Sequence, residues 1–195
     1  MMQEEIKQIK EIDGEVRGLG IKNVLDFISE KRGKEGVEKT KEEMEKLGFI
    51  LDYDNISLMR FYSIQTYLML TLISKRFLGF GDKEFQEMGD FMAKSSLILR
   101  LLLRHFASLD NTVVQAPRAW RKYFSVGALD VPEIDRENKY ILFTLKEFNF
   151  DPLHCQITTG FLSATIQMVL NKKVNVEEKR CFFRGDDYHE FLVSW

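Results

Sequence analysis

The chain has 195 residues, of which 45% are hydrophobic, and its formal net charge is −2. That length and apolar content suffice for one domain with a sizeable core. The balanced charge gives no support for binding nucleic acid or an anionic membrane surface. No apolar run reaches the roughly 18 residues of a membrane-spanning helix. With only two cysteines and a charged N-terminus that does not resemble a signal peptide, we expect a cytoplasmic chain without disulfide bonds.

The first quarter of the chain predicts two amphipathic helices that cover a core. Residues 1–13 form either a frayed helix or a disordered lead, and residues 14–20 form a break with a short extended segment. A helix follows in which the apolar residues recur at helical spacing, namely Ile21, Val24, Leu25 and Ile28. A second, mostly charged helix runs from about residue 34 to 47 and ends at Gly48.

The middle of the chain is more apolar. Residues 61–81 are apolar nearly all round, which predicts a buried helix. Residues 85–106 predict a long helix with apolar residues on more than one face, which therefore needs two packing partners. Met and Phe are abundant here, and both fill irregular apolar space. They suit a cavity for a hydrophobic ligand, but composition alone favours an ordinary core.

Strand patterns appear in the second half. The segment 117–127 predicts a helix that stops at Gly127. Residues 131–134 and 139–148 then predict two strands joined by a polar turn. Together with a C-terminal hairpin, they give an antiparallel sheet of about four strands packed by several helices, an α+β fold.

The last 45 residues begin with a helix. Asp151 is a good N-cap and Pro152 suits the first helical position, and the helix runs to about Leu170. Cys155 lies on its packing face by helical spacing. Gly160 in mid-helix costs roughly 1 kcal/mol relative to Ala, which indicates that another backbone approaches closely there.

A two-stranded hairpin ends the chain. Alternation points Val176 and Glu178 inward on one strand and His189 and Phe191 inward on the next, with a turn at residues 185–187. Buried Glu and His are costly unless satisfied. A metal would satisfy them, since a set of thiolates, imidazole and carboxylate is typical of tetrahedral zinc.

The candidate metal ligands are Cys155, Glu178, Cys181 and His189. Glu178 and Cys181 are three residues apart, so a regular strand would point them to opposite faces. Both can bind one ion only if the strand bulges at residues 179–180. Otherwise the site consists of two ordinary buried cysteines, a half-exposed Glu and a surface His. His154 is a second candidate ligand.

The order Cys155, Gly160, Glu178-x-x-Cys181 and Gly185-Asp186, before an apolar strand that ends in Trp, resembles the vinyl-4-reductase domain family. That family is grouped with the TRAPP Golgi-trafficking subunits and the haem NO-binding domains. The resemblance covers the last 45 residues and is looser over residues 15–130. In family members that sense phenols and xylenes, a further Cys past the Gly-Asp turn completes a zinc site. Here His189 stands at that position, an exchange that zinc sites tolerate.

The resemblance implies a small-molecule sensor domain spanning residues 1–195, with a structural zinc ion and an apolar ligand. It also implies a homodimer formed through helices and a separate signalling partner protein, since the chain has no room for an output domain. Related sensors place a Trp against the ligand, which makes Trp120 the first candidate for the pocket; its alternative role is to close the core. The other pocket candidates are Tyr123, Phe124, Phe91 and Tyr67.

Three other functions stay open. An assembly protein like the TRAPP subunits would hold a fatty acyl chain or nothing. An enzyme is less favoured, because no dinucleotide fingerprint is present, adjacent His154 and Cys155 point about 100° apart on a helix, and a metal hydrolase would need Glu178 as a general base. A haem sensor would use a Tyr-x-Ser-x-Arg motif, but the nearest match ends in Gly127; its axial ligand would be His105.

Overall fold

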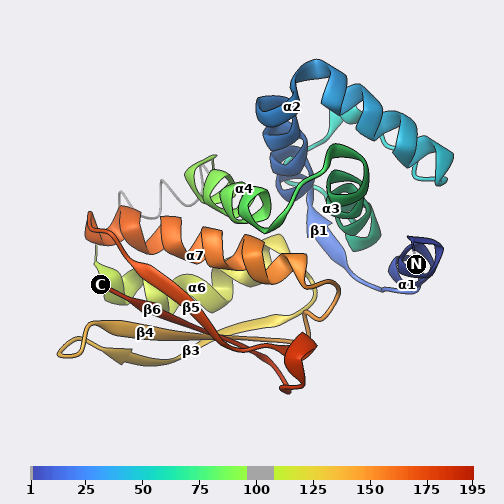
Figure 1. Ribbon diagram of the computed structural model, residues 1–195. Coiled ribbons are helices and arrows are strands. Elements are labelled where there is room, and N and C mark those ends of the chain that lie inside the picture. The colour runs from blue at the N-terminus through green and yellow to red at the C-terminus, as the bar shows by residue number, and fades with distance from the viewer. Residues whose placement is uncertain (1, 96–107) are drawn as a thin grey trace. The chain divides into compact units, whose positions relative to one another are not determined.

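The computed structural model describes residues 2–95 and 108–195 and divides into two compact units (Figure 1). The first unit comprises the chain up to Gly81 together with Tyr123–Ser125. The second comprises the described parts of 82–122 and 126–195. The single ligand-binding domain over residues 1–195 stays a prediction.

The first unit is helical with a short two-stranded ribbon. Its elements in order are α1 (Met2–Lys10), β1 (Glu15–Arg17), α2 (Gly18–Lys46), the 3-10 turn η1 (Tyr53–Asn55), β2 (Phe61–Ser63) and α3 (Ile64–Leu78). Strands β1 and β2 pair antiparallel. The lead segment is thus helical over most of its length, and the expected extended segment at residues 14–20 is β1.

Helix α2 contains the two helices that the sequence predicts. They meet at Gly33, whose φ of 66° and ψ of −167° are not helical. Only glycine adopts such a conformation readily. The half before Gly33 does more than cover a core, because Ile21, Val24 and Ile28 are fully buried.

Helix α3 is the buried helix expected from residues 61–81. It begins after Ser63, whose hydroxyl accepts a hydrogen bond from the Gln65 N–H, and it ends at Gly79 in the left-handed conformation. Every residue from Tyr67 to Ser74 is buried. Helix α3 packs against α2, and the buried apolar side chains of the two helices form a hydrophobic core.

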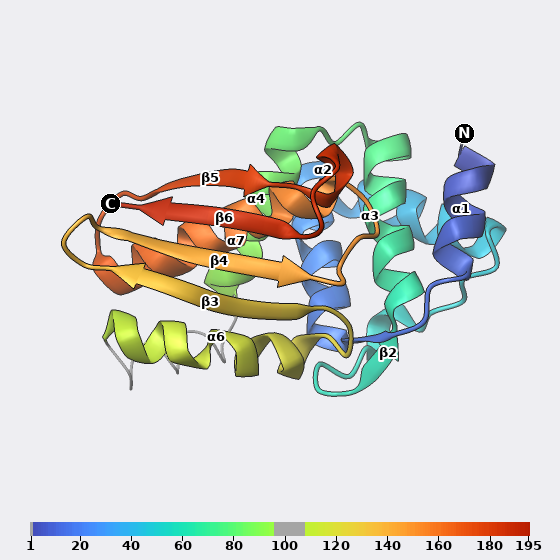
Figure 2. The ribbon, with the colours of Figure 1, turned by 90° about the horizontal axis from the view of Figure 1, so that it is seen from below.

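The second unit contains an antiparallel four-stranded sheet in the order β3-β4-β6-β5. Figure 2 shows the strands side by side with α7 behind them. Their bounds are β3 (Ala128–Asp135), β4 (Tyr140–Lys146), β5 (Asn175–Arg180) and β6 (His189–Ser194). The side chains of one sheet face are buried, among them Ile141, Phe143, Phe191 and Val193. The predicted α+β fold with a four-stranded antiparallel sheet is confirmed.

The other described elements of this unit are α4 (Asp82–Ser95), α6 (Leu109–Tyr123), α7 (Leu153–Leu170) and the 3-10 turn η2 (Phe182–Arg184). The remainder of the predicted helix 85–106 lies outside the described residues, as does His105. The helix expected from Pro117 begins earlier, at Leu109, where the Ser108 hydroxyl accepts from the Asn111 N–H. Pro117 lies inside this helix, so the expectation that it marks the start is wrong.

Helices α4 and α7 cross with their backbones in close contact. A Cβ atom placed on Gly160 would lie 1.9 Å from the Gln86 carbonyl oxygen, and one placed on Gly89 would lie 1.9 Å from the Ile157 carbonyl oxygen. Any side chain at either position would collide with the facing helix. The close approach that Gly160 predicts is therefore confirmed, and Gly89 is its counterpart.

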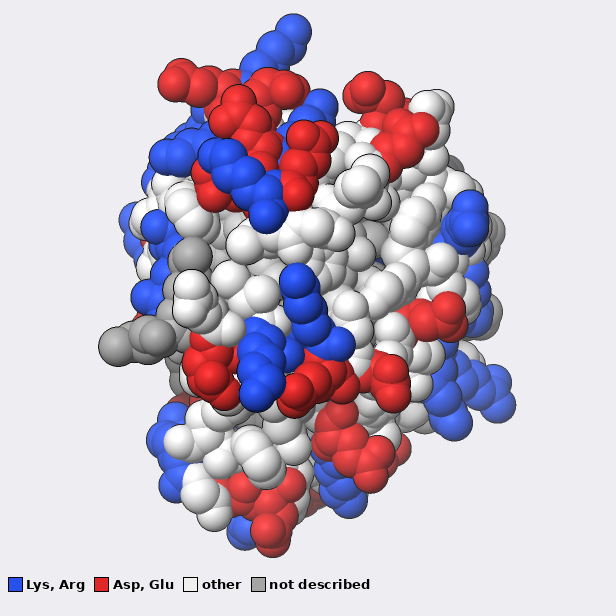
Figure 3. All heavy atoms as spheres, turned by 90° about the vertical axis from the view of Figure 1, so that its right-hand side faces the viewer, with Lys and Arg blue, Asp and Glu red and all other residues white. Residues whose placement is uncertain are grey.

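The surface carries no marked charge separation on the face shown in Figure 3, where acidic and basic side chains are intermixed. Within α2, Lys41 pairs with Glu38 and Lys46 pairs with Glu43. Within residues 2–95 and 108–195, we find no helix with the length and hydrophobicity to traverse a bilayer.

Candidate metal centre

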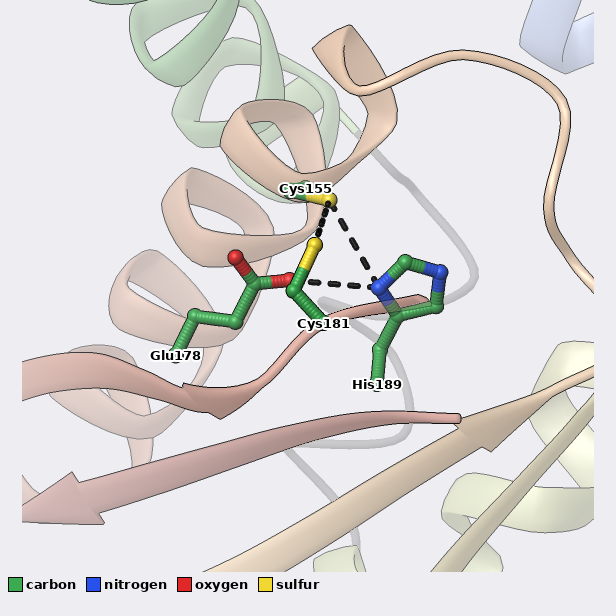
Figure 4. Close-up of side chains that lie close together, drawn as sticks. All are labelled: Cys155, Glu178, Cys181 and His189. Carbon is green, nitrogen blue, oxygen red and sulfur yellow. Dashed lines mark hydrogen bonds and ion pairs between the residues drawn. The ribbon is translucent and has the colours of Figure 1, made fainter. Parts of the chain in front are cut away.

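Four side chains from three elements of the second unit point toward one another (Figure 4). Cys155 comes from α7, Glu178 from β5, and His189 from the start of β6, while Cys181 directly follows β5. One ligand atom from each lies within 4.8 Å of the others. Cys155, Cys181 and His189 are buried and Glu178 is half-buried. The structure thus brings together the four residues that the sequence singles out.

The first turn of α7 fixes Cys155. An Asp151 carboxylate oxygen accepts a hydrogen bond from the Leu153 N–H at 2.8 Å, as expected of a capping residue. Cys155 is the third residue of the helix and lies on its buried side, with Leu162 and Ile166 further along the same side. The helix ends at Asn171, the stop that the sequence predicts, in the left-handed conformation.

A β-bulge places Glu178 and Cys181 on the same side. Glu178 pairs with Phe191 and Arg180 pairs with Glu190, so Lys179 is an extra residue in β5. One extra residue reverses the alternation of side chains beyond it. Cys181 therefore faces the side to which Glu178 points, and the predicted bulge at residues 179–180 is confirmed.

The turn between the strands is held by hydrogen bonds to the Cys181 backbone. The Cys181 N–H donates to an Asp186 carboxylate oxygen at 2.8 Å, and the Cys181 carbonyl accepts from the Arg184 N–H at 2.8 Å. Gly185, with a φ of 97°, permits the reversal of the chain. His189 then opens β6 opposite Leu145.

Three of the six separations between the ligand atoms match those around a tetrahedral ion. The Sγ atoms of Cys155 and Cys181 are 3.7 Å apart, the Cys155 Sγ and His189 Nδ1 are 3.6 Å apart, and His189 Nδ1 and a Glu178 carboxylate oxygen are 3.2 Å apart. With Zn–S of about 2.3 Å and Zn–N or Zn–O of about 2.0–2.1 Å, a tetrahedron places these pairs at about 3.8, 3.6 and 3.3 Å. The donor set and these three separations fit zinc.

Without a cation, the pKa of the Cys155 thiol is raised and the pKa of the Glu178 carboxyl is lowered. Burial, reinforced by the Glu178 carboxylate and Cys181, raises the pKa of the Cys155 thiol. Burial also opposes ionisation of Glu178, but hydrogen bonds from His189, Cys155 and Cys181 and the charge of Arg184 outweigh it and lower the pKa of that carboxyl. A divalent cation would favour the thiolate forms, because metal binding competes with protons for these ligands.

His154, the other ligand candidate, is not part of the cluster. Its side chain is 4% exposed, and its ring lies edge-on to the ring of Phe148 with centroids 5.5 Å apart. Burial lowers the pKa of His154 to about 4, so it is neutral at pH 7. Its place beside Cys155 in the sequence puts it on a different side of α7.

The five ligand-pocket candidates fall in both units. The Trp120 ring packs edge-on against Phe148 with centroids 5.0 Å apart, and its indole N–H donates to the Val126 carbonyl. In the first unit, the rings of Tyr67 and Phe124 are 5.8 Å apart. Phe91 on α4 and Tyr123 at the end of α6 are half-buried. A ligand-binding role for all five stays a prediction.

Two residues support the cluster in ways that the sequence does not predict: Arg184, which no sequence pattern singles out, and Asp186, which is predicted only as part of the Gly-Asp turn. Arg184 reaches Glu178, with a guanidinium nitrogen 3.4 Å from a carboxylate oxygen and a second nitrogen donating to the Glu178 carbonyl at 3.0 Å. Asp186 holds the Cys181 backbone N–H. Asp186 belongs to the Gly-Asp turn, which was a usable signal; nothing in the order of residues indicates that Arg184 turns back onto β5.

The haem motif is incomplete in this chain. Gly127 stands where the motif has Arg, and it cannot supply a cation. The Ser125 hydroxyl accepts a hydrogen bond from the Glu15 N–H at 2.7 Å, so it is engaged within the first unit. Residues 123–127 therefore do not fit the haem-binding pattern.

No family model matches the sequence. An uncharacterised protein of Methanocaldococcus jannaschii is 30% identical over 102 residues, which cover 49% of this chain and 57% of that protein. The match thus spans little more than half the length of this relative.

Solved structures resemble the chain more extensively. An H-NOX protein from Shewanella oneidensis in the Fe(II)NO ligation state matches with a TM-score of 0.69 and 13% identity, covering 91% of this chain and 98% of that one. This chain shares the H-NOX fold. A trafficking protein particle complex subunit 3 from Naegleria fowleri, covalently bound to palmitic acid, overlaps less, with a TM-score of 0.47 and 15% identity over 64% of this chain and 88% of that one.

Proposed function

We propose that this chain is a small-molecule sensor domain of the vinyl-4-reductase type, with a structural zinc ion held by Cys155, Glu178, Cys181 and His189. The observation that carries the proposal is the match between three ligand-atom separations and those of a tetrahedral zinc site. The sequence motif and the shared H-NOX fold support the same assignment.

The zinc ion would join α7 to the C-terminal hairpin. Cys155 comes from the helix, whereas the other three ligands come from β5, β6 and the turn between them. Four protein ligands leave no coordination position for a substrate, so the role is structural and not catalytic. Because the ligands come together only in the folded chain, zinc binding would stabilise this unit.

The sensed molecule would be apolar and small. The H-NOX protein that shares this fold was solved in the Fe(II)NO ligation state, so in that protein the fold accommodates a small ligand. In the present chain Trp120 would contact an apolar compound instead. We further propose that the signal passes through a homodimer or a separate partner protein.

The zinc part of the proposal is tested by elemental analysis of the purified, untagged protein. We expect about one zinc per chain, lost in Cys181→Ala and reduced in Glu178→Gln. Glu177→Gln is the matched control, because Glu177 is the exposed neighbour that pairs with Lys179. Wild-type protein without zinc, or zinc retained in Cys181→Ala, would overturn the site.

The sensor part is tested separately with a fluorescent apolar probe and small aromatic competitors. We expect saturable probe binding that competitors reverse and that Trp120→Ala weakens at least about tenfold, the loss of roughly 1.4 kcal/mol of contact. Zinc-loaded protein that binds no probe would contradict the sensor role and leave an assembly role for the zinc-stabilised fold.

A further inference from the structure

The turn between the last two strands brings a cation onto the candidate zinc site. Arg184 lies in η2, after Cys181 and before His189. One guanidinium nitrogen is 3.4 Å from a carboxylate oxygen of Glu178, and another donates to the main-chain carbonyl of Glu178 at 3.0 Å. Arg184 therefore contacts both the side chain and the backbone of this one ligand.

The two carboxylate oxygens of Glu178 have different neighbours. Oε1 lies 3.2 Å from His189 Nδ1, on the cluster side, whereas Oε2 faces Arg184. Rotation of the carboxylate toward solvent would break the contact with Arg184. The Glu178 side chain is 14% exposed against 55% for Arg184, so the contact joins a mostly buried carboxylate to a largely exposed guanidinium.

The charge balance of the site also requires a cation. Two thiolates, one carboxylate and a neutral imidazole around a divalent ion leave one net negative charge in a mostly buried cluster. The single positive charge of Arg184 cancels it at short range. Residues that orient metal ligands typically contribute about 10–100-fold to metal affinity.

We infer that Arg184 is the positioning residue that holds Glu178 as the fourth zinc ligand and so closes the site to water. This inference rests on the proposed zinc site. If Arg184 is absent, Glu178 is released, water takes its position, and the metal acquires the open coordination of a catalytic site.

The experiment compares Arg184→Met with Arg180→Met. Arg180 is a closely matched control, because its side chain is 53% exposed and it pairs with Glu190, which is not a ligand, at 3.9 Å. Zinc affinity is measured by competition with a chromophoric chelator. The ligands are followed from the d–d absorption of the Co²⁺-substituted protein, whose bands shift when water replaces a protein ligand and weaken when water adds as a fifth ligand.

We expect Arg184→Met to weaken zinc binding at least about tenfold and to change the Co²⁺ d–d spectrum, with partial recovery in Arg184→Lys. Arg180→Met should leave both within about twofold of wild type. Equal effects of the two Met variants, or an unchanged Co²⁺ spectrum in Arg184→Met, would overturn the inference. Arg184→Gln provides the same comparison should the Met variant not fold. Absence of zinc from the wild type would instead refute the zinc site itself.

Discussion

His189 shows how much can be predicted for a single residue. Alternation along the last strand predicts that its side chain points inward, and the structure gives it 2% exposure. A buried imidazole needs a partner, and here Glu178 and Cys155 lie within reach. The charge and expected burial of single residues were therefore enough to predict the cluster. The contact of Arg184 with Glu178 could not be predicted in this way, because it depends on how the turn between β5 and β6 folds back.

Tyr67 carries a prediction about pH. It is 2% exposed, and burial raises the pKa of its hydroxyl above the usual value of 10.0. In the unfolded chain Tyr67 loses its proton near pH 10, whereas in the folded chain it keeps it. The folded state therefore binds more protons above pH 10, and stability falls as the pH rises.

The measurement is urea unfolding of wild type and Tyr67→Phe at pH 8 and at pH 10.5–11. The wild type should lose up to about 1.4 kcal/mol more per pH unit above pH 10 than the variant. Removal of the hydroxyl itself changes the free energy of unfolding by the same amount at every pH. The difference between the two proteins at pH 8 gives this amount. Parallel pH profiles of the two proteins would contradict the buried position of this phenol.

The bulge in β5 is the element on which the candidate site depends most. Deleting Lys179 would make the strand regular and would point Cys181 away from Glu178. We expect the deletion to abolish zinc binding, while Lys179→Ala, which keeps the extra residue, binds zinc like the wild type. Zinc content after dialysis distinguishes the two. Zinc retained in the deletion variant would show that the bulge is not required.

The contact between α4 and α7 gives a second prediction at this scale. In an exposed helix, Gly→Ala stabilises by about 1 kcal/mol. Here Gly160→Ala should instead destabilise by about 1–3 kcal/mol or more, because the new methyl group would meet the Gln86 carbonyl. Thermal unfolding of the metal-free protein measures the change, and Gly89→Ala should behave alike. A stabilised Gly160→Ala protein would disprove the tight crossing.

Sequence patterns predicted elements well where a local signal decides their ends. Asp151 and Asn171 bound α7 as expected, because capping and left-handed residues act locally. The predicted start of α6 is too late. Pro117 favours the start of a helix, but this helix begins directly after Ser108. The partner of Gly160 could not be predicted, because Gly89 meets it only through the packing of two distant segments.

In the molecule as a whole, all four residues of the candidate metal site lie in the second of the two compact units. A ligand that binds only the folded form stabilises the part of the chain that binds it. Removing zinc with a chelator should therefore increase amide hydrogen exchange mainly in residues 153–195. Exchange in residues 15–78 should change much less. Equal increases in both ranges, or none in either, would contradict a zinc ion that stabilises the C-terminal segment.

The fold class and the grouping of Cys155, Glu178, Cys181 and His189 could be predicted from the sequence, whereas the division into two units could not. Periodicity reports which face of an element is buried, but not which neighbours bury it. Tyr123–Ser125, for example, belong with the first unit although the chain on either side belongs to the second. Phe124 forms an isolated β-bridge with Val16. The two residues lie far apart in the sequence, so no local pattern could indicate that they pair.

The most direct test of the proposed four-ligand zinc site is X-ray absorption at the zinc edge of the purified protein. We expect the zinc ion to have two sulfur neighbours at about 2.3 Å and two nitrogen or oxygen neighbours at about 2.0–2.1 Å. That shell would correspond to Cys155, Cys181, His189 and Glu178. A shell of nitrogen and oxygen alone, a fifth light neighbour, or no zinc at all would contradict it.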